Sequence, residues 1–340
     1  MTDGGARFDL RNLLGGGSDI RTLAMLLVVL MGAFAVLLPG EFLRAATFQA
    51  MAFQLPELGL LALAMAVTML TGGINLSIIA TANMCGIVTA AILTRTVPGD
   101  VAVGAAGAGY ILLAMTAGLV TSLLLGLLNG FIVAYLGVSP ILATLGTMTL
   151  IDGIAVVLTK GRVISGFPRA VLAIGNGDVL GFPVPMVIFL TTALAVGVLL
   201  NRTPWGVSVY MIGSNQTATE FSGVRVRSVL MRVYMLSGIL CGLASLVMIS
   251  RFNSAKSGYA ASYLLVTVLA SVLGGVDPGG GFGRVPGLIL ALSILQVVSS
   301  GLNLLGVSSH LTVALWGGII IFITSLNLLR SSRRLSKRSA

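Results

Sequence analysis

Long apolar stretches, separated by short clusters of glycine, proline and charged residues, follow one another along nearly the whole chain. A helix needs about 20 mostly apolar residues to cross the hydrocarbon core of a bilayer. Stretches near that length lie at residues 22–39, 55–71, 74–94, 108–134, 141–159, 185–201, 229–250, 262–274, 285–303 and 310–329. The pattern predicts an all-α polytopic membrane protein with about ten transmembrane helices.

Glycines interrupt the pattern at two places. The stretch at 74–94 follows its predecessor across only residues 71–73, and the stretch at 262–274 is short and ends in two glycines. Irregular backbone at membrane depth is tolerated only where it is buried in protein or lines a cavity. Because discontinuous helices often mark a transport path, we expect some helices to be discontinuous and both breaks to belong to the pathway.

Composition supports a membrane protein and excludes a soluble one. Of the 340 residues, 56% are hydrophobic and only 9% are charged, whereas soluble domains carry about 25% charged residues. The 44 glycines and the low aromatic content of 6% favour closely packed helices over a β-barrel.

Site chemistry of the usual enzymatic kinds is missing from the sequence. Cys85 and Cys241 lie in separate apolar runs and are interpreted as small buried residues, and His310 is the only histidine. No metal site, cofactor or catalytic residue is therefore predicted. No GxxxxGK[ST] motif is present, so ATP energy has to come from another subunit.

Lysine and arginine predict the orientation, because they concentrate in cytoplasmic loops. The basic tail at 330–340 has no acidic residue, and the loop at 202–228 has only Glu220 against Arg225 and Arg227. Both segments are therefore expected on the cytoplasmic side. An even number of spans also places the leader at 1–21 inside, so that both termini flank a permease domain at 22–329. The net charge of +10 is attributed to attraction to membrane lipid, and nucleic acid is dismissed.

This orientation leaves several basic residues outside. Arg162, Arg251 and Lys256 belong to stretches on the external side. They are either ordinary solvated loop charges or a basic rim that docks an acidic binding protein by electrostatic complementarity.

Uncharged polar residues inside the spans are candidates for the translocation pathway. Amides at membrane depth have to find partners across helices or face water, and a neutral polyhydroxylated solute would meet matching groups on such a lining. The candidates are Asn75, Ser77, Asn83, Asn129, Thr144, Thr147, Gln296 and Asn303. Asp152 is the one serious candidate for a buried carboxylate of the kind that couples ion movement to transport. A position near the outer membrane interface explains it as well.

A short helix is expected within the cytoplasmic loop. Asn215 can cap its start and Gly223 can end it, and such a helix is a plausible contact for a cytoplasmic motor. The residues assigned to this ATPase coupling are Gly213, Asn215, Ala218, Glu220, Ser222 and Gly223.

Five stretches together resemble the permease subunits of ribose-type ABC importers, a family that also includes branched-chain amino-acid permeases. They are the coupling loop at 212–224, GGINLS at 72–77, LGTM at 145–148, VLGG to GGFGR at 272–284 and LNLLGVSS at 302–309. The resemblance covers about residues 50–325. Asn75 stands where the family commonly has Asp, and Ile79 where it usually has Gly, which argues against ribose itself.

The resemblance implies a multi-pass protein of the bacterial inner membrane. Its implied partners are two cytoplasmic ATPase subunits or one fused ATPase, a second permease chain of the same or a homologous kind, and a periplasmic substrate-binding protein. The implied solute is a monosaccharide or a related polyhydroxylated compound. A branched-chain amino-acid permease is the runner-up, followed by an ion-coupled secondary carrier; an intramembrane enzyme lacks the groups for catalysis.

Overall fold

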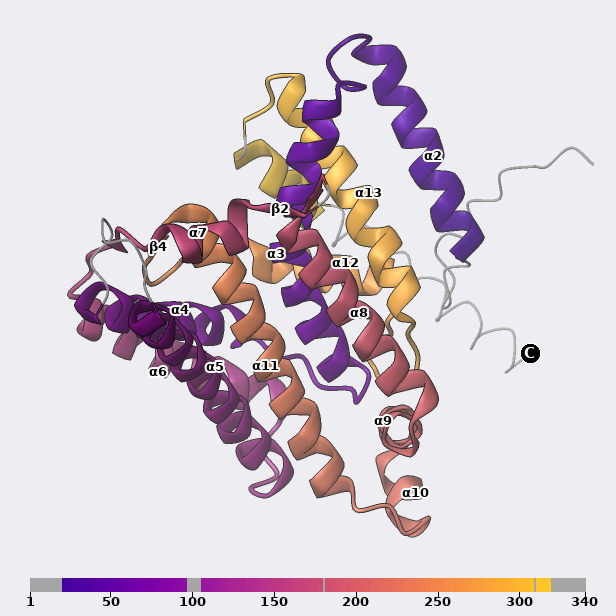
Figure 1. The fold of residues 1–340 in the computed structure, drawn as a ribbon. Helices are drawn as coiled ribbons and strands as arrows, with labels where there is room; N and C mark the ends of the chain where they lie inside the picture. The colour runs from indigo at the N-terminus through magenta and orange to yellow at the C-terminus, as the bar shows by residue number, and fades with distance from the viewer. Residues whose placement is uncertain (1–19, 97–104, 180, 309, 319–340) are drawn as a thin grey trace, which may run out of the picture.

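The computed structural model describes residues 20–96, 105–179, 181–308 and 310–318. Within these ranges, eight helices are long and apolar enough to cross a membrane. They are α2 (Ile20–Leu37), α3 (Ala45–Met69), α4 (Ile78–Thr96), α5 (Ala105–Ala134), α6 (Pro140–Thr159), α8 (Val184–Arg202), α11 (Val226–Phe252) and α13 (Val285–Leu304) (Figure 1). The prediction of an all-α polytopic membrane protein is confirmed.

Shorter elements connect these helices. The helices among them are α7 (Arg169–Asn176), α9 (Pro204–Ser214), α10 (Gln216–Phe221) and α12 (Tyr263–Leu273). The strands β1 (Ile164–Ser165) and β4 (Ser254–Ala255) pair antiparallel, as do β2 (Asp178–Val179) and β3 (Phe182–Pro183). Figure 1 shows α9 and α10 at one end of the molecule, with α7 and β4 toward the other.

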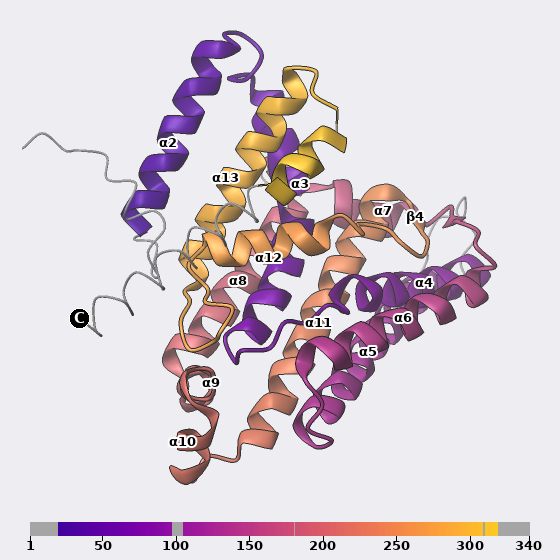
Figure 2. The same ribbon diagram turned by 180° about the vertical axis from the view of Figure 1, so that it is seen from behind.

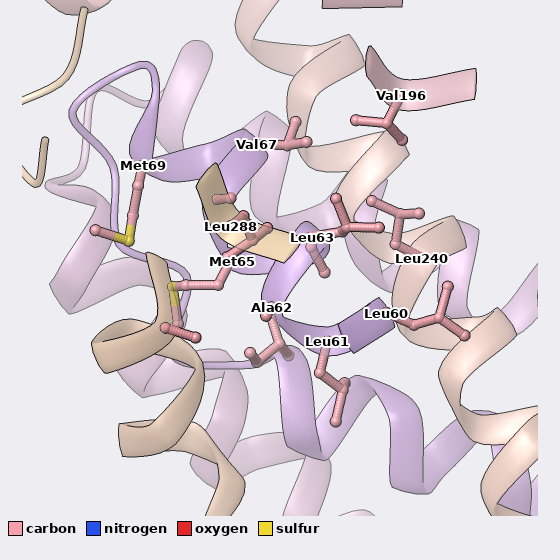
Figure 3. Close-up of a cluster of buried hydrophobic side chains, with 14 of the residues drawn as sticks. Leu60, Leu61, Ala62, Leu63, Met65, Val67, Met69, Val196, Leu240 and Leu288 are labelled. Carbon is pink, nitrogen blue, oxygen red and sulfur yellow. The ribbon is translucent and has the colours of Figure 1, made fainter. Parts of the chain in front are cut away.

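Helices α3 and α11 form the centre of the structure. Every residue of α3 from Leu55 to Met69 is buried, because its sequence is apolar on all sides rather than on one stripe. Figure 3 shows its Leu63 beside Leu240 of α11, and Leu63 and Val67 line one small pocket together with Val196 of α8. A helix that is buried all round cannot face lipid, and α3 is packed on its sides by α4, α8, α11, α12 and α13.

Small residues let α5 and α11 approach each other closely. A Cβ atom added at Gly126 would lie 3.1 Å from the Cα of Gly238, and one added at Gly130 would lie 2.9 Å from the sulfur of Met231. Gly242 likewise faces Ser122 of α5. The spacing of glycines every four residues therefore has the packing role that the sequence indicated.

The observed helices refine the predicted spans. Helix α3 begins ten positions before residue 55 and contains Pro56, and α4 begins at Ile78 rather than at 74 because residues 70–77 are not helical. The predicted eighth span is the short helix α12 of 11 residues. Of the predicted tenth span, residues 310–318 are helical and the rest lies outside the described residues. Residues 1–19 of the predicted leader at 1–21 and the basic tail at 330–340 also lie outside them.

Candidate functional site

The first break separates α3 from α4 at residues 70–77. The chain turns at Gly72, whose φ of +78° belongs to the left-handed region that favours glycine. The break is not loose, because the side chains that follow it are buried and hydrogen-bonded: Asn75 is 3% exposed and Ser77 is fully buried.

A polar network fastens this break to α5, α6 and α11. Asn75 Nδ2 donates to Ser237 Oγ at 3.1 Å, and Ser77 Oγ donates to Asn75 Oδ1 at 2.8 Å. Asn129 of α5 continues the network, since its Nδ2 donates to Ser77 Oγ at 2.8 Å. Thr147 Oγ1 donates to Asn129 Oδ1 at 2.6 Å. Thr144 adds a further link, because its Oγ1 accepts from the Leu76 N–H at 3.0 Å.

Five of the predicted pathway residues therefore meet in one cluster. The amide and hydroxyl groups of four of them bond to one another, and the Thr144 hydroxyl bonds to the backbone of the break, which meets the requirement that buried polar groups have partners. In this conformation their hydrogen bonds link α5, α6 and α11 to the break. The five are Asn75, Ser77, Asn129, Thr144 and Thr147. Asn83 lies apart from them, where its Nδ2 donates to the carbonyl of Tyr259 at 3.2 Å.

The second break joins α12 to α13 through residues 274–284. Asp277 shapes its turn: its carboxylate accepts from the Gly279 N–H at 2.8 Å, and its carbonyl accepts from the Gly280 N–H at 2.9 Å. The N–H of Gly281 donates to the carbonyl of Leu70 at 2.9 Å. The two breaks that the sequence singled out are thus in direct contact.

The end of α9 packs into the same place. A Cβ atom on Gly213 would overlap the carbonyl of Leu70 and the N–H of Gly281, and one on Gly280 would lie 2.6 Å from the nitrogen of Gly72. We name this contact of Gly72, Gly213, Gly280 and Gly281 the glycine junction. Three backbone segments meet there at a distance that leaves no room for side chains.

Tyr210 reinforces the contact between α9 and the second break. Its phenol donates to the carbonyl of Gly283 at 3.0 Å. Burial raises the pKa of Tyr210, and the positive charge of Arg284 lowers it by less, so the phenol stays protonated and able to donate.

Five of the six predicted coupling residues form an exposed knob at 215–223, beyond α9, whereas Gly213 belongs to α9 itself and lies in the glycine junction. Asn215 caps α10 by accepting from the Ala218 N–H at 2.9 Å, and Gly223 leaves the helix with a φ of +81°, as expected. Glu220 and Ser222 are exposed. Helix α9 was not predicted as a separate helix. Phe221 was not singled out either, although it lies outside the spans and is 89% exposed. An apolar ring in that position is typical of a protein contact.

A polar cavity lies between α3, α12, α13 and the helix at 310–318. Its volume is about 290 Å³, and it is lined by Gln54, Leu58, Ser262, Tyr263, Val266, Leu295, Gln296, Ser299, Asn303, Val307, Thr312, Val313 and Trp316. Gln296 and Asn303 were predicted as pathway residues. Gln54 was missed because it precedes the apolar run at 55–71, and Trp316 because an indole in an apolar run gives no signal of its own.

Comparison with known proteins decides the family. The sequence model of a family described as branched-chain amino acid transport system / permease component matches residues 47–324. This chain belongs to that family of ABC importer permeases. It is a multi-pass membrane transport subunit and not an enzyme.

Curated relatives agree with this assignment. The permease is 32% identical over 272 residues to the autoinducer 2 import system permease protein LsrD of Yersinia enterocolitica, which covers 78% of each chain. It is 32% identical over 310 residues to the protein of the same name from Escherichia coli strain SMS-3-5, covering 88% of this chain and 89% of the relative. The protein of that name from Salmonella typhi is 31% identical over 272 residues. No solved structure matches the chain.

The three basic residues expected outside have different surroundings in the permease. Arg162 is exposed, and Lys256 is half-buried with its Nζ 4.8 Å from the centre of the Tyr259 ring. Arg251 is engaged within the fold, because its Nη1 binds the buried carboxylate of Glu57. Of these three residues, only Arg162 and Lys256 have no ion pair among the described residues. Docking through Arg251 stays a prediction, and it would compete with the ion pair to Glu57 for the same guanidinium.

Proposed function

We propose that this chain is one permease subunit of an importer in the bacterial inner membrane, and that it passes a neutral polyhydroxylated solute such as a monosaccharide. The solute would arrive from a periplasmic binding protein, and ATP would be hydrolysed by two separate cytoplasmic subunits or one fused subunit. A second permease chain, identical or homologous, would complete the translocation path.

The observation that carries this proposal is the glycine junction. The knob formed by α10 continues from α9, and α9 contacts both helix breaks through backbone atoms at Gly213. A backbone contact without flexible side chains transmits displacement directly, because nothing between the segments can rearrange to absorb it. A motor that pushes on α10 would therefore move the ends of α3 and α12 together.

The knob has the features of a docking site for the motor. Phe221 offers an exposed aromatic anchor, and Glu220 and Arg225 provide charges beside it. Aromatic anchors that become buried in a partner supply much of the binding energy at interfaces.

The nature of the solute is supported by the lining of the cavity. The family description refers to branched-chain amino acids, while the curated relatives are described as importers of autoinducer 2. None of the cavity-lining residues is charged. An amino-acid zwitterion would lose the hydration of two charges without gaining counter-charges, so the lining favours a neutral solute over the amino-acid alternative. Family membership argues against an ion-coupled secondary carrier.

Reconstitution tests the proposal. Proteoliposomes that contain this permease with its second permease chain, ATPase and binding protein should accumulate solute only when ATP is enclosed with the ATPase. Omission of the ATPase or of the binding protein should each abolish uptake. Uphill uptake driven by a proton or sodium gradient without ATPase would contradict the proposal.

Charge reversal tests the docking of the binding protein. Arg162→Glu and Lys256→Glu should slow uptake most at low ionic strength, because rim charges act mainly on the rate of encounter. Arg202→Glu, at the exposed end of α8 on the opposite side of the molecule, should leave that salt dependence unchanged. Unaltered uptake by both external variants at low salt would return these residues to the solvated-loop interpretation.

A further inference from the structure

We propose that the cavity between α3, α12, α13 and the helix at 310–318 is a solute-binding site within the permease, and that Gln54 and Gln296 hold the hydroxyl groups of the solute while Trp316 packs against its carbon skeleton. This inference rests on the proposed function and deepens it. It assigns to the permease a recognition step of its own, in addition to recognition by the binding protein.

The two glutamines form an oriented pair. Gln296 Nε2 donates to Gln54 Oε1 at 3.1 Å and to Ser300 Oγ at 3.1 Å, which occupies both of its N–H groups. The Oε1 of Gln296 and the Nε2 of Gln54 have no hydrogen-bond partner among the described residues. A free acceptor and a free donor are therefore left on two cavity-lining side chains that are themselves hydrogen-bonded to each other.

Such a pair matches the chemistry of adjacent hydroxyl groups. Each hydroxyl donates one hydrogen bond and accepts others, whereas a carbonyl oxygen only accepts and an NH₂ group only donates. One hydroxyl of a vicinal diol can donate to Gln296 while its neighbour accepts from Gln54. Asn303, Ser299 and Ser262 add further neutral polar groups around the wall.

The remaining wall is apolar and partly aromatic. Trp316 is 6% exposed, and Tyr263 lines the cavity from the first turn of α12. Rigid aromatic side chains supply contact area at a low cost in conformational entropy. The volume of about 290 Å³ is at the small end of small-molecule pockets, about 300 Å³ and upward, which suits a solute of monosaccharide size.

Helix α12 connects the cavity to the contact between α9 and the second break. It is lined by the first turn of α12 and the second half of α13. Figure 2 shows the second half of α13 at the opposite end of the molecule from α9 and α10. The other end of α12 runs into the second break, where Tyr210 and Gly213 of α9 are bound. Movement of α9 would therefore shift α12 and change the shape of the cavity.

Protection from thiol labelling tests the site directly. A cysteine introduced as Ser299→Cys would lie on the wall, whereas Cys85 and Cys241 are both buried. The assembled transporter in lipid vesicles is treated with a membrane-impermeant methanethiosulfonate reagent, and labelling of this chain is followed by mass spectrometry. D-ribose, D-xylose, D-galactose and myo-inositol are added one at a time at millimolar concentration, with L-leucine as the zwitterionic comparison.

We expect at least one of the polyhydroxylated probes to slow labelling and leucine to have no effect. Gln296→Leu on the same background should weaken that protection about two- to tenfold, the value of a neutral hydrogen bond. The matched control is Gln49→Leu, the same substitution at an exposed position of α3 outside the cavity, which should retain protection.

Three results would overturn the inference. They are labelling of Ser299→Cys no faster than that of the natural cysteines, absence of protection by every polyhydroxylated probe, and equal protection by leucine. ATP-dependent uptake is measured in the same vesicles. Uptake without protection would overturn only the site, while the absence of ATP-dependent uptake in the wild type would overturn the proposed function.

Discussion

Arg251 forms an ion pair with Glu57, with 2.7 Å between Nη1 and Oε1. Arg251 lies in the last turn of α11, and Glu57 lies at the middle of α3. Glu57 is fully buried, and its other carboxylate oxygen has no partner among the described residues. Arg251 also donates to the carbonyl of Phe53 at 3.3 Å. The pair therefore joins α3 to the last turn of α11, and removal of the cation would leave a buried carboxylate without a partner.

Arg251→Ala should lower the free energy of unfolding by about 3 kcal/mol, because breaking a buried pair leaves an uncompensated group behind. SDS-induced unfolding of the purified permease measures this change. Arg162→Ala, at an exposed position, should change stability by less than about 0.5 kcal/mol. Addition of Glu57→Gln to the Arg251→Ala variant should restore part of the loss. Equal stability of the Arg251 and Arg162 variants would show that the pair contributes nothing.

Asn129→Ala should destabilise the permease by about 1 to 2 kcal/mol, since it removes the partners of Ser77 and Thr147 at once. The same unfolding assay applies. Asn201→Ala is the control, because Asn201 is exposed and bonds only within α8. Wild-type stability of Asn129→Ala would mean that water replaces the amide.

Gly213→Ala should impair transport more than insertion, because its methyl group would overlap the backbone of both helix breaks. Overpacking of this kind costs about 1 to 3 kcal/mol, here concentrated at the junction. The readout is solute transported per ATP hydrolysed in proteoliposomes. Gly153→Ala on α6, where a Cβ atom would meet no neighbour, is the matched control. A normal ratio for Gly213→Ala would exclude the junction as the coupling contact.

Gly223→Val should release the ATPase or uncouple its activity, because a β-branched residue at a φ of +81° adds strain of about 1 to 2 kcal/mol at the end of the knob. Gly223→Asn should be much milder, since asparagine adopts this conformation more readily. Co-purification of the ATPase and solute-stimulated hydrolysis measure the effect. If valine and asparagine behave alike, the conformation of Gly223 is not what the motor requires.

Phe221→Ala should weaken the affinity of the ATPase for the permease by more than about 1 kcal/mol, while stability in the absence of the ATPase stays unchanged. The reason is that 89% of this ring is exposed in the isolated subunit and makes little contribution to its fold. Binding of purified ATPase to permease in nanodiscs gives the affinity. Val207→Ala, an exposed apolar residue of α9, serves for comparison. Unchanged affinity would place the docking surface elsewhere.

The apolar runs predicted the long helices well because lipid exposure and burial both demand apolar residues. The limits of α3 were harder to predict: Thr47, Gln49 and Gln54 interrupt the run, yet the helix continues through them. Helix α9 escaped notice for the related reason that its mixture of Trp205, Gly206 and Gly213 has no helical period of its own. Tertiary contacts, not local pattern, decide these segments.

In the candidate site, too, the sequence predicts which groups need partners, whereas tertiary contacts decide which partners they meet. The sequence could say that amides such as Asn75 need partners, but not that Asn75 meets Ser237 of α11. Each glycine of the junction has an ordinary local explanation, and only the folded chain brings Gly72 and Gly213 together. The cavity was half predicted, through Gln296 and Asn303, because its other polar wall comes from Gln54 outside the expected span.

The bond between Asn75 and Ser237 also bears on biosynthesis. The two residues are 162 positions apart, and chains are synthesised at about 5 to 20 residues per second. Asn75 therefore leaves the ribosome roughly 8 to 30 seconds before its partner exists. During that interval the unpaired amide disfavours release of the α3–α4 pair into lipid. The first helices are thus expected to wait at the insertion machinery until α11 arrives.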